Sequence, residues 1–406
     1  MRRYIVCLGD GMSDLPIPAL GNKTPLEYAN TPNMDWIALN GQAGLVSTVP
    51  EELSPGSDVA NMGILGYDPR HYYSGRGPIE AAAMGISPGP GQVVFRCNLV
   101  TIQDDVMVSF TSGHVDSEDG AALLAELNDA FFGSLIQFFP GVSYRNIALF
   151  PNEWVGVETT APHDITDQVV GPYWPRGDGA VGITDIVAKA RSVLEASPVN
   201  GRRIRAGKLP VTDIWPWSQG KMPVLPSFKD QHGVTGGIVT AVDLLRGLAQ
   251  LTGLEYPLVE GATGFLDTNY KGKMAAAFEI LERHPFVFIH IEAPDECGHL
   301  GDHDKKVQAI EDFDCNVVGP VLQYQRTHGD VSVLVMPDHP TPCALKTHIN
   351  SPVPVAVVYP GIDRDAAATY SETGVCPGRF NFDTPWDMMN VFLSWHGSNL
   401  HGADGA

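Results

Sequence analysis

Short apolar runs alternate with helical patterns along most of this chain, and that alternation restricts its fold more than any other feature. Five runs have the length and composition of buried strands: RYIVCL (3–8), GLVSTV (44–49), PFVFIHIE (285–292), VSVLVM (331–336) and PVPVAVVY (352–359). Apolar residues at three- and four-residue steps predict helices over 25–40 and 304–326. The alternation predicts an α/β fold, with a largely parallel sheet covered by helices on both faces.

The middle of the chain has a different character. It is richer in tryptophan, proline and Gly-Asp turns, as in PNEWVGVE, GPYWPRGDG and VTDIWPWSQGK. Helical patterns persist there over 119–132 and 185–196. We therefore predict a smaller α+β domain over residues 108–221, inserted into a core formed by residues 1–107 and 222–406.

Composition narrows the classes of partner. The chain has 406 residues, 44% of them hydrophobic, and a formal net charge of −21. No basic face is visible, so nucleic acid is not an expected partner. An acidic protein can still bind a small anionic substrate if it places cations locally, either as arginines or as metal ions held by its surplus carboxylates.

The apolar runs and the cysteines indicate a cellular setting. The runs are far shorter than the ~20 residues that a membrane span needs, so no membrane association is expected. At the N-terminus, Gly9, Asp10 and Gly11 interrupt the apolar run at once, which argues against a secretory signal. The six cysteines form no CxxC pair, so reduced thiols are expected rather than a zinc knuckle or a redox motif. A cytoplasmic location is the expectation.

Metal-ligand residue types follow three of the predicted strands. In an open α/β sheet, ligands bind beyond the carboxyl ends of the strands. A lone aspartate at such a position is commonly a turn or cap residue, and a lone histidine is commonly just a polar side chain. Their conjunction favours a metal centre, and the spacing of Asp295 and His299 places both on one side of a helical turn. The candidate ligands are Asp10, Asp295, His299, Asp338, His339 and His348.

The ligand set predicts two divalent ions. Mixed carboxylate and imidazole ligands suit Mn²⁺ or Zn²⁺, whereas Mg²⁺ suits the histidines less well. Three aspartates and three histidines exceed what one tetrahedral ion needs, and two ions about 3.5–4 Å apart fit better.

Ser57 lies in SPGSDVANMGILGYDP (54–69), where a helix is predicted to begin. Taken alone, this serine is a helix cap. A hydroxyl is a poor nucleophile unless something removes its proton, and a neighbouring metal ion would do so. The backbone N–H groups at the helix start would then hold a phosphoryl oxygen. Neither GxGxxG after a strand nor GxxxxGK[ST] is present, which argues against a nucleotide-binding loop.

Several motifs, in order, resemble the archaeal-type cofactor-independent phosphoglycerate mutases of the alkaline phosphatase superfamily. They are LGDGMSD, TPNMD, PGSDVANMGILGYDP, GRGPIEAAAMGI, FRCNLVT, GATGFLDTNYKGK, APDECGH and MPDHPTP. The resemblance implies a phosphatase-like core whose inserted domain closes over the active site. It also implies interconversion of 3-phosphoglycerate and 2-phosphoglycerate in glycolysis and gluconeogenesis, without bisphosphoglycerate and without a nucleotide.

The resemblance also assigns roles within the site. Ser57 matches the serine that is transiently phosphorylated in a double displacement. Asp10, Asp338 and His339 match the ligands of the metal ion that also touches this serine. Asp295, His299 and His348 match the ligands of a second metal ion. Manganese is the favoured element for both ions.

The substrate contacts are expected among cationic residues. Arg76 and Arg96 are candidates for the phosphate or the carboxylate, although structural ion pairs would explain them equally well. His114, Arg202 and Lys221 are the candidates in the insert, since a closing domain must meet a carboxylate with positive charge. The insert reads NGRRIRAGK and WPWSQGK, which is less rich in arginine than the archaeal enzymes it resembles. Lys273, in TNYKGK, is a further candidate.

Two other functions remain open on the same fold. The bacterial branch that the chain resembles has also been proposed to act as a homoserine kinase, which would place it in threonine biosynthesis. A metal-dependent phosphatase is the other alternative. A non-catalytic binding module fits less well, because six metal ligands and a serine are more than binding requires.

Overall fold

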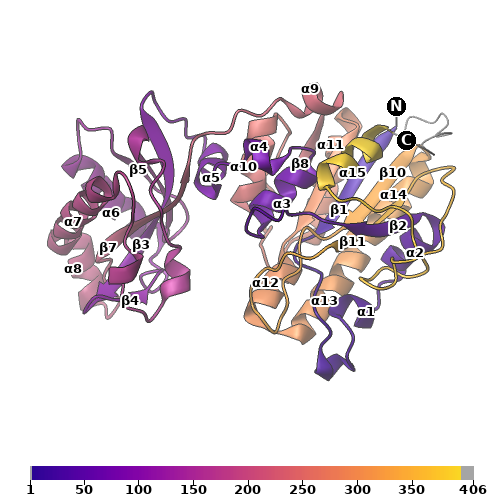
Figure 1. The fold of residues 1–406 in the computed structure, drawn as a ribbon, viewed down its shortest axis with the longest axis horizontal. Helices are drawn as coiled ribbons and strands as arrows, with labels where there is room; N and C mark the ends of the chain where they lie inside the picture. Colours follow the sequence, from indigo (N-terminus) through magenta and orange to yellow (C-terminus); the bar gives the residue numbers. More distant parts are fainter. Residues whose placement is uncertain (1, 395–406) are drawn as a thin grey trace. The chain divides into compact units, whose positions relative to one another are not determined.

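The computed structural model describes residues 2–394. The chain forms two compact units: the residues up to Tyr73 together with those from Val224 onward, and Ser74–Pro223 (Figure 1). The predicted return to the core at residue 222 lies close to Val224, where the first unit resumes. The predicted start of the insert at residue 108 differs, since residues 74–107 belong to the second unit. The reason is strand pairing: β3 (Gln92–Gln103) lies between β6 (Arg145–Pro151) and β7 (Asp213–Gly220).

The first unit is built on a six-stranded sheet in the order β2-β11-β10-β1-β9-β8. The strands are β1 (Arg3–Gly9), β2 (Gln42–Val46), β8 (Gly236–Val239), β9 (Phe286–Ile291), β10 (Val331–Met336) and β11 (Val353–Val358). β10, β1, β9 and β8 run parallel, whereas β11 and β2 are antiparallel to their neighbours. The register pairs Leu8 with Met336 and Gly9 with Ile291. The carboxyl ends of β1, β9 and β10 therefore lie side by side.

Helices cover both faces of this sheet, as predicted. Ile5 and Cys7 of β1 belong to one buried cluster, with side chains from α2 (Pro32–Asn40), α11 (Tyr270–Arg283) and α13 (His303–Phe313). On the opposite face, the ring of Tyr4 lies 5.6 Å from that of Phe392 in α15 (Pro385–Ser394). The remaining helices of this unit include α3 (Ser57–Ile64), α4 (Pro69–Tyr72), α9 (Phe228–His232), α10 (Asp243–Thr252) and α12 (Ala293–Leu300).

Two predicted helices are interrupted. The segment 25–40 forms α1 (Pro25–Tyr28) and α2, because Pro32 disfavours helical geometry in the residue before it. The segment 304–326 forms α13, a π turn (Asp314–Val318) and α14 (Gly319–His328). The Asp314 carboxylate at this turn accepts hydrogen bonds from the backbone N–H groups of Asn33 and Met34, so the irregular turn fixes the start of α2.

The second unit is an antiparallel sheet with helices. Its strands follow the order β4-β3-β6-β5, and β7 pairs with β3 along the edge opposite β6. β4 spans Val106–Ser109 and β5 spans Gln137–Phe139. α6 (Ser117–Ala130), α7 (Ala180–Ala196) and α8 (Pro198–Arg205) contribute to one buried cluster on this sheet, and α5 (Arg76–Ala83) packs against β3 and β7. Within residues 2–394, no helix has the length and apolarity to cross a bilayer.

Candidate metal centre and active site

The six predicted metal ligands come together as two groups at the carboxyl ends of the strands. Asp10 follows β1, and Asp338 and His339 follow β10, while Asp295 and His299 lie on α12, directly after β9. His348 lies between β10 and β11. Within each group, one ligand atom from every residue lies within 4.8 Å of the others; the groups are Asp10, Asp338 and His339, and Asp295, His299 and His348.

The first group is fully buried. His339 Nε2 lies 3.5 Å from an oxygen of Asp10 and 3.5 Å from an oxygen of Asp338. The N–H groups of Gly11 and His339 donate to Asp338 Oδ1. In contrast, Asp10 Oδ1 accepts no hydrogen bond from residues 2–394. Burial and the nearby Asp338 carboxylate raise the pKa of Asp10 well above its usual range. A bound cation would compensate for both effects, so this group fits a divalent metal ion.

The second group is more open. Asp295 Oδ2 lies 3.2 Å from His299 Nε2, Asp295 Oδ1 lies 3.4 Å from His348 Nε2, and the two Nε2 atoms are 3.0 Å apart. The Nδ1 of His299 lies 3.0 Å from the carbonyl oxygen of Lys346, which fixes the ring and leaves Nε2 for a ligand bond. The Asp295 carboxylate raises the pKa of His299 to about 9. Two imidazoles and a carboxylate that converge in this way suit a divalent ion.

The two groups are neighbours. The rings of His339 and His348 have centroids 4.1 Å apart. The hydroxyl of Thr341 donates to Asp295 Oδ1 at 2.5 Å and lies 3.3 Å from His339 Nδ1. Thr341 therefore links a ligand of one group to a ligand of the other, although no motif in the sequence singled it out.

Ser57 lies at the edge of the first group. It is the first residue of α3, and its Oγ is 3.1 Å from His339 Nε2. The helix cap is Gly56, and no side-chain cap bond forms, so the prediction that Ser57 is the cap is wrong by one residue. Because the Ser57 side chain forms no cap bond, its hydroxyl lies toward the metal ligands instead. One turn later, Asn61 donates to both the Ser57 carbonyl and Asp338 Oδ2, at 2.9 and 2.7 Å.

Gly11 is required where β1 leads into the site. Its φ of +60° lies in the left-handed region, which favours glycine. A Cβ at this position would lie 2.6 Å from Asp295 Oδ1 and 2.6 Å from Thr341 Oγ1. The absence of a side chain at Gly11 thus lets a ligand of the second group approach β1.

A third group adjoins Asp10. It consists of Asp10, His290 and Glu292, and we refer to it as the third group. His290 Nε2 lies 2.9 Å from Asp10 Oδ2 and 3.7 Å from Glu292 Oε2. His290 was missed because it lies within the apolar run of β9, where a histidine has the appearance of an ordinary core residue.

Three arginines gather around Glu80 in the second unit. Arg76 Nε lies 2.7 Å and Arg96 Nε 2.9 Å from the Glu80 carboxylate, and Arg96 lies over the Trp217 ring at 4.2 Å. Burial lowers the pKa of Arg96 to about 10, with Arg76 and Arg145 adding repulsion. We call Arg76, Arg96 and Arg145 the arginine cluster. All three guanidinium groups act on the buried Glu80 carboxylate, and positive charge gathered in this way suits an anion.

Comparisons with known proteins identify the family. A model described as 2,3-bisphosphoglycerate-independent phosphoglycerate mutase matches residues 38–200. The protein of that name from Methanosarcina barkeri is 45% identical over 395 residues, which cover 96% of this chain and 99% of its own. The chain belongs to the 2,3-bisphosphoglycerate-independent phosphoglycerate mutase family. A probable mutase of the same name from Geobacter sulfurreducens is 46% identical over 397 residues, with 96% and 99% of the two chains covered.

Solved structures agree with this family assignment. A cofactor-independent phosphoglycerate mutase from Thermoplasma acidophilum has a TM-score of 0.67 and 26% identity, with 98% of this chain and 100% of that chain covered. The PH0037 protein from Pyrococcus horikoshii has a TM-score of 0.81 and 28% identity, with 99% of both chains covered. The predicted α/β fold and family are thereby confirmed.

The other predicted substrate contacts occupy different surroundings. The His114 ring lies 6.3 Å from that of Tyr144, which in turn contacts Arg145 of the arginine cluster. Arg202 is exposed on α8, with Nη2 3.9 Å from an Asp119 oxygen. Lys221 is exposed after β7, and its carbonyl accepts a hydrogen bond from Ser74. Arg145 was missed because only strand pairing, Asn98 with Arg145, brings it beside Arg96.

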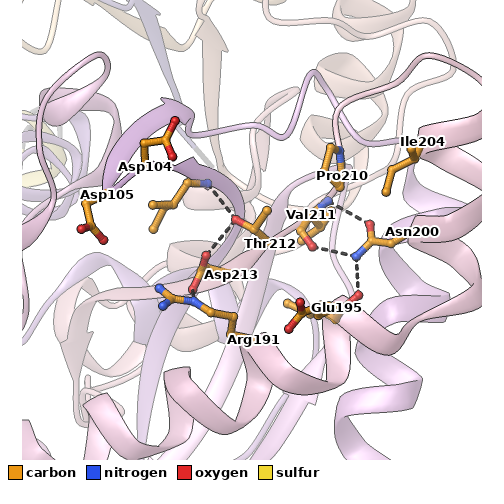
Figure 2. Close-up of a pocket in the computed structure, with 12 residues that line it drawn as sticks. Asp104, Asp105, Arg191, Glu195, Asn200, Ile204, Pro210, Val211, Thr212 and Asp213 are labelled. Carbon is orange, nitrogen blue, oxygen red and sulfur yellow. Dashed lines mark hydrogen bonds and ion pairs between the residues drawn. The ribbon is translucent and has the colours of Figure 1, made fainter.

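A cavity of about 440 Å³ in the second unit is lined by residues outside the set predicted from the sequence for the site. Its lining includes Asp104, Asp105, Arg191, Glu195, Asn200 and Asp213 (Figure 2). Asn200 bonds the Leu194 and Val211 carbonyls, and Arg191 pairs with Asp213 at 2.7 Å. Because the buried polar groups are satisfied by the chain itself, these contacts hold α7 and α8 against β7.

Proposed function

We propose that this member of the mutase family interconverts 3-phosphoglycerate and 2-phosphoglycerate, without added bisphosphoglycerate, through a phosphoserine at Ser57. The observation that carries the proposal is the position of the Ser57 hydroxyl, 3.1 Å from His339 Nε2 beside two sets of potential metal ligands. The names of relatives that are 45% and 46% identical support the same activity.

We propose that the two groups hold two Mn²⁺ ions. Asp10, Asp338 and His339 would hold the ion nearer Ser57, and Asp295, His299 and His348 would hold the other. When bound, the ions would favour the ionised serine hydroxyl and offset the negative charge of the transferred phosphoryl group.

The chain's own residues then account for the transfer. Ser57 Oγ gives up its proton and attacks the phosphorus of bound phosphoglycerate, and the bond from phosphorus to the substrate's ester oxygen breaks. The released oxygen takes up a proton, so that phosphoserine and glycerate result. The other hydroxyl of glycerate then gives up its proton and attacks the phosphoserine, and Ser57 Oγ leaves and regains a proton. At the start of α3, the Val59 N–H donates to Asp58 Oδ1 and the Ala60 N–H donates to the Gly56 carbonyl. The N–H groups of Ser57 and Asp58 are therefore the ones that would hold a phosphoryl oxygen.

We assign binding of the substrate carboxylate to the second unit. The arginine cluster gathers positive charge, and His114 lies at its edge through Tyr144. The first unit would thus supply the chemistry, and the second would supply the cations for the substrate carboxylate. The proposed substrate is a glycolytic intermediate, so the proposal places the chain in glycolysis and gluconeogenesis and in the cytoplasm.

A substrate test distinguishes this function from its alternatives. Protein loaded with Mn²⁺ is given 3-phosphoglycerate, and 2-phosphoglycerate is measured through coupled enolase without bisphosphoglycerate. Conversion is expected, with no net release of inorganic phosphate. Phosphate release without isomerisation would identify a phosphatase. Phosphorylation of homoserine by ATP, with no mutase activity, would identify a kinase and overturn the proposal.

A further inference from the structure

A buried carboxylate that is not among the proposed metal ligands lies next to the nucleophile. Asp58 follows Ser57 in the first turn of α3 and is buried. A carboxylate can accept hydrogen bonds but has no proton to donate to a phosphoryl oxygen. It also competes with that oxygen for the backbone N–H groups of the same turn, because aspartate side chains readily bond to neighbouring N–H groups. The placement of this carboxylate therefore decides whether the N–H groups are open to the substrate.

Both oxygens of the Asp58 carboxylate accept hydrogen bonds. Oδ1 accepts the N–H of Val59 at 3.0 Å, and Oδ2 accepts the hydroxyl of Tyr73 at 2.5 Å. The same carboxylate lies beside Gly56, where an added Cβ would be 2.8 Å from Oδ1. The carboxylate is thus engaged by these two donors, which leaves the N–H groups of Ser57 and Asp58 to the substrate.

Tyr73 is held in place through both its backbone and its ring. It ends α4, and its N–H donates to the Pro69 carbonyl at 2.9 Å. Its ring packs against a buried cluster that includes Val59 and Ala60 of α3. The hydroxyl is therefore fixed beside the first turn of α3 before it binds Asp58, so little conformational freedom is lost in forming that bond.

We propose that Tyr73 is a positioning residue for phosphoryl transfer, because its hydroxyl holds the Asp58 carboxylate off the N–H groups that receive the phosphoryl oxygen. This rests on the proposed function, in which Ser57 accepts the phosphoryl group. Tyr73 donates its proton to Asp58 and so acts through that residue rather than on the substrate. Without the hydroxyl, Asp58 keeps only the Val59 N–H and can turn toward the N–H groups that the substrate needs.

The first test is the binding of inorganic phosphate to Mn²⁺-loaded protein, measured by titration calorimetry. Tyr73→Phe keeps the ring and removes only the hydroxyl, so it should weaken phosphate binding about tenfold and leave the affinity for Mn²⁺ unchanged. Tyr72→Phe is the matched control, because the contacts of Tyr72 with Tyr67 and His71 are made by its ring. This control should bind phosphate as the wild type does. Wild-type phosphate affinity in Tyr73→Phe would overturn the proposal.

A double-mutant cycle shows whether Tyr73 acts through Asp58. Asp58→Ala removes the competing carboxylate, so adding Tyr73→Phe to it should change the phosphate affinity by less than about twofold. An equal loss of affinity in both backgrounds would overturn the proposal, because the hydroxyl would then act on the site by another route. Failure of Tyr73→Phe to fold would also overturn it, since the hydroxyl would then be required for the structure itself.

The rate of Ser57 phosphorylation gives a reading on the reaction step. In a rapid-quench experiment with 3-phosphoglycerate and excess Mn²⁺-loaded protein, Tyr73→Phe should form phosphoserine about tenfold more slowly than the wild type, because the phosphoryl group is less well placed. A tyrosine with a structural role alone would lower the urea midpoint and leave this rate unchanged, and that result would overturn the proposal.

The outcomes separate this inference from the proposed function. A protein that loses phosphate affinity on Tyr73→Phe, but whose wild type does not isomerise phosphoglycerate, would refute the function and leave the role of Tyr73 intact. An active mutase in which Tyr73→Phe changes neither phosphate binding nor the rate of phosphoserine formation would do the reverse.

Discussion

Replacing Gly11 by alanine should damage the metal centre although Gly11 is not itself a metal ligand. The new Cβ would lie 2.6 Å from Asp295 Oδ1, 2.6 Å from Thr341 Oγ1 and 2.8 Å from the Asp295 Cα. Left-handed backbone costs an alanine about 1–2 kcal/mol. The overlap adds about 1–3 kcal/mol, since backbone as well as side chain must move. The free energy of unfolding should therefore fall by about 2–5 kcal/mol.

The effect on metal binding separates this variant from a merely destabilised one. Asp295 must shift, so the affinity for Mn²⁺ should fall about 10- to 100-fold, as it does when the support of a metal ligand is lost. Gly21→Ala is the matched control: its φ is +72°, yet no atom lies within 4 Å of the added Cβ. It should show the backbone cost alone and bind Mn²⁺ normally. Isothermal titration and urea unfolding measure both quantities. Wild-type Mn²⁺ affinity in Gly11→Ala would refute the reasoning.

Three further predictions address other parts of the chain. Arg76→Gln removes a cation from the arginine cluster and should raise the KM for 3-phosphoglycerate about tenfold or more, without changing the affinity for Mn²⁺. The exposed control Arg205→Leu should keep the wild-type KM. An unchanged KM in Arg76→Gln would argue against the cluster as the carboxylate site. Because Asp295 raises the pKa of His299 to about 9, this histidine is protonated at pH 7 in metal-free protein and must lose that proton to bind a metal ion. The affinity for Mn²⁺ should therefore rise about tenfold per pH unit between pH 7 and 9. A flat pH profile in titration calorimetry would contradict the assignment. Lys306→Met should lower the free energy of unfolding by about 3–5 kcal/mol, because it leaves the Asp14 carboxylate, 2.9 Å from Lys306 Nζ, buried without its cation. Urea unfolding of the wild type and the variant measures this difference. A loss below about 1 kcal/mol would contradict the role of Lys306 as the cation of Asp14.

The strand ends explain why much of the site could be predicted from sequence. A buried parallel strand is a short apolar run, and the residue that ends it lies at the ligand-binding edge. Asp10, Asp295 and Asp338 could therefore be placed together from the order of elements alone. The ligand role of each remains a prediction that Mn²⁺ titration can test.

Other features depended on tertiary contacts that no local pattern carries. The break of the predicted 304–326 helix at the π turn reflects the bonds of Asp314 to the start of α2, far away in sequence. The second unit begins at Ser74 because β3 pairs with later strands rather than with the first sheet. His290 is hidden for a related reason, since a polar residue within an apolar run shows its role only when its partners are known.

The phosphoserine at Ser57 is the most direct test of the account. Mn²⁺-loaded protein is mixed with 3-phosphoglycerate, quenched in acid and digested, and the peptide that contains Ser57 is examined by mass spectrometry. One phosphoryl group is expected on Ser57 during turnover. No 2-phosphoglycerate is expected from Ser57→Ala, although that variant should fold and bind two Mn²⁺ ions. Substantial isomerisation by Ser57→Ala, or a phosphoryl group on another residue instead, would contradict this mechanism.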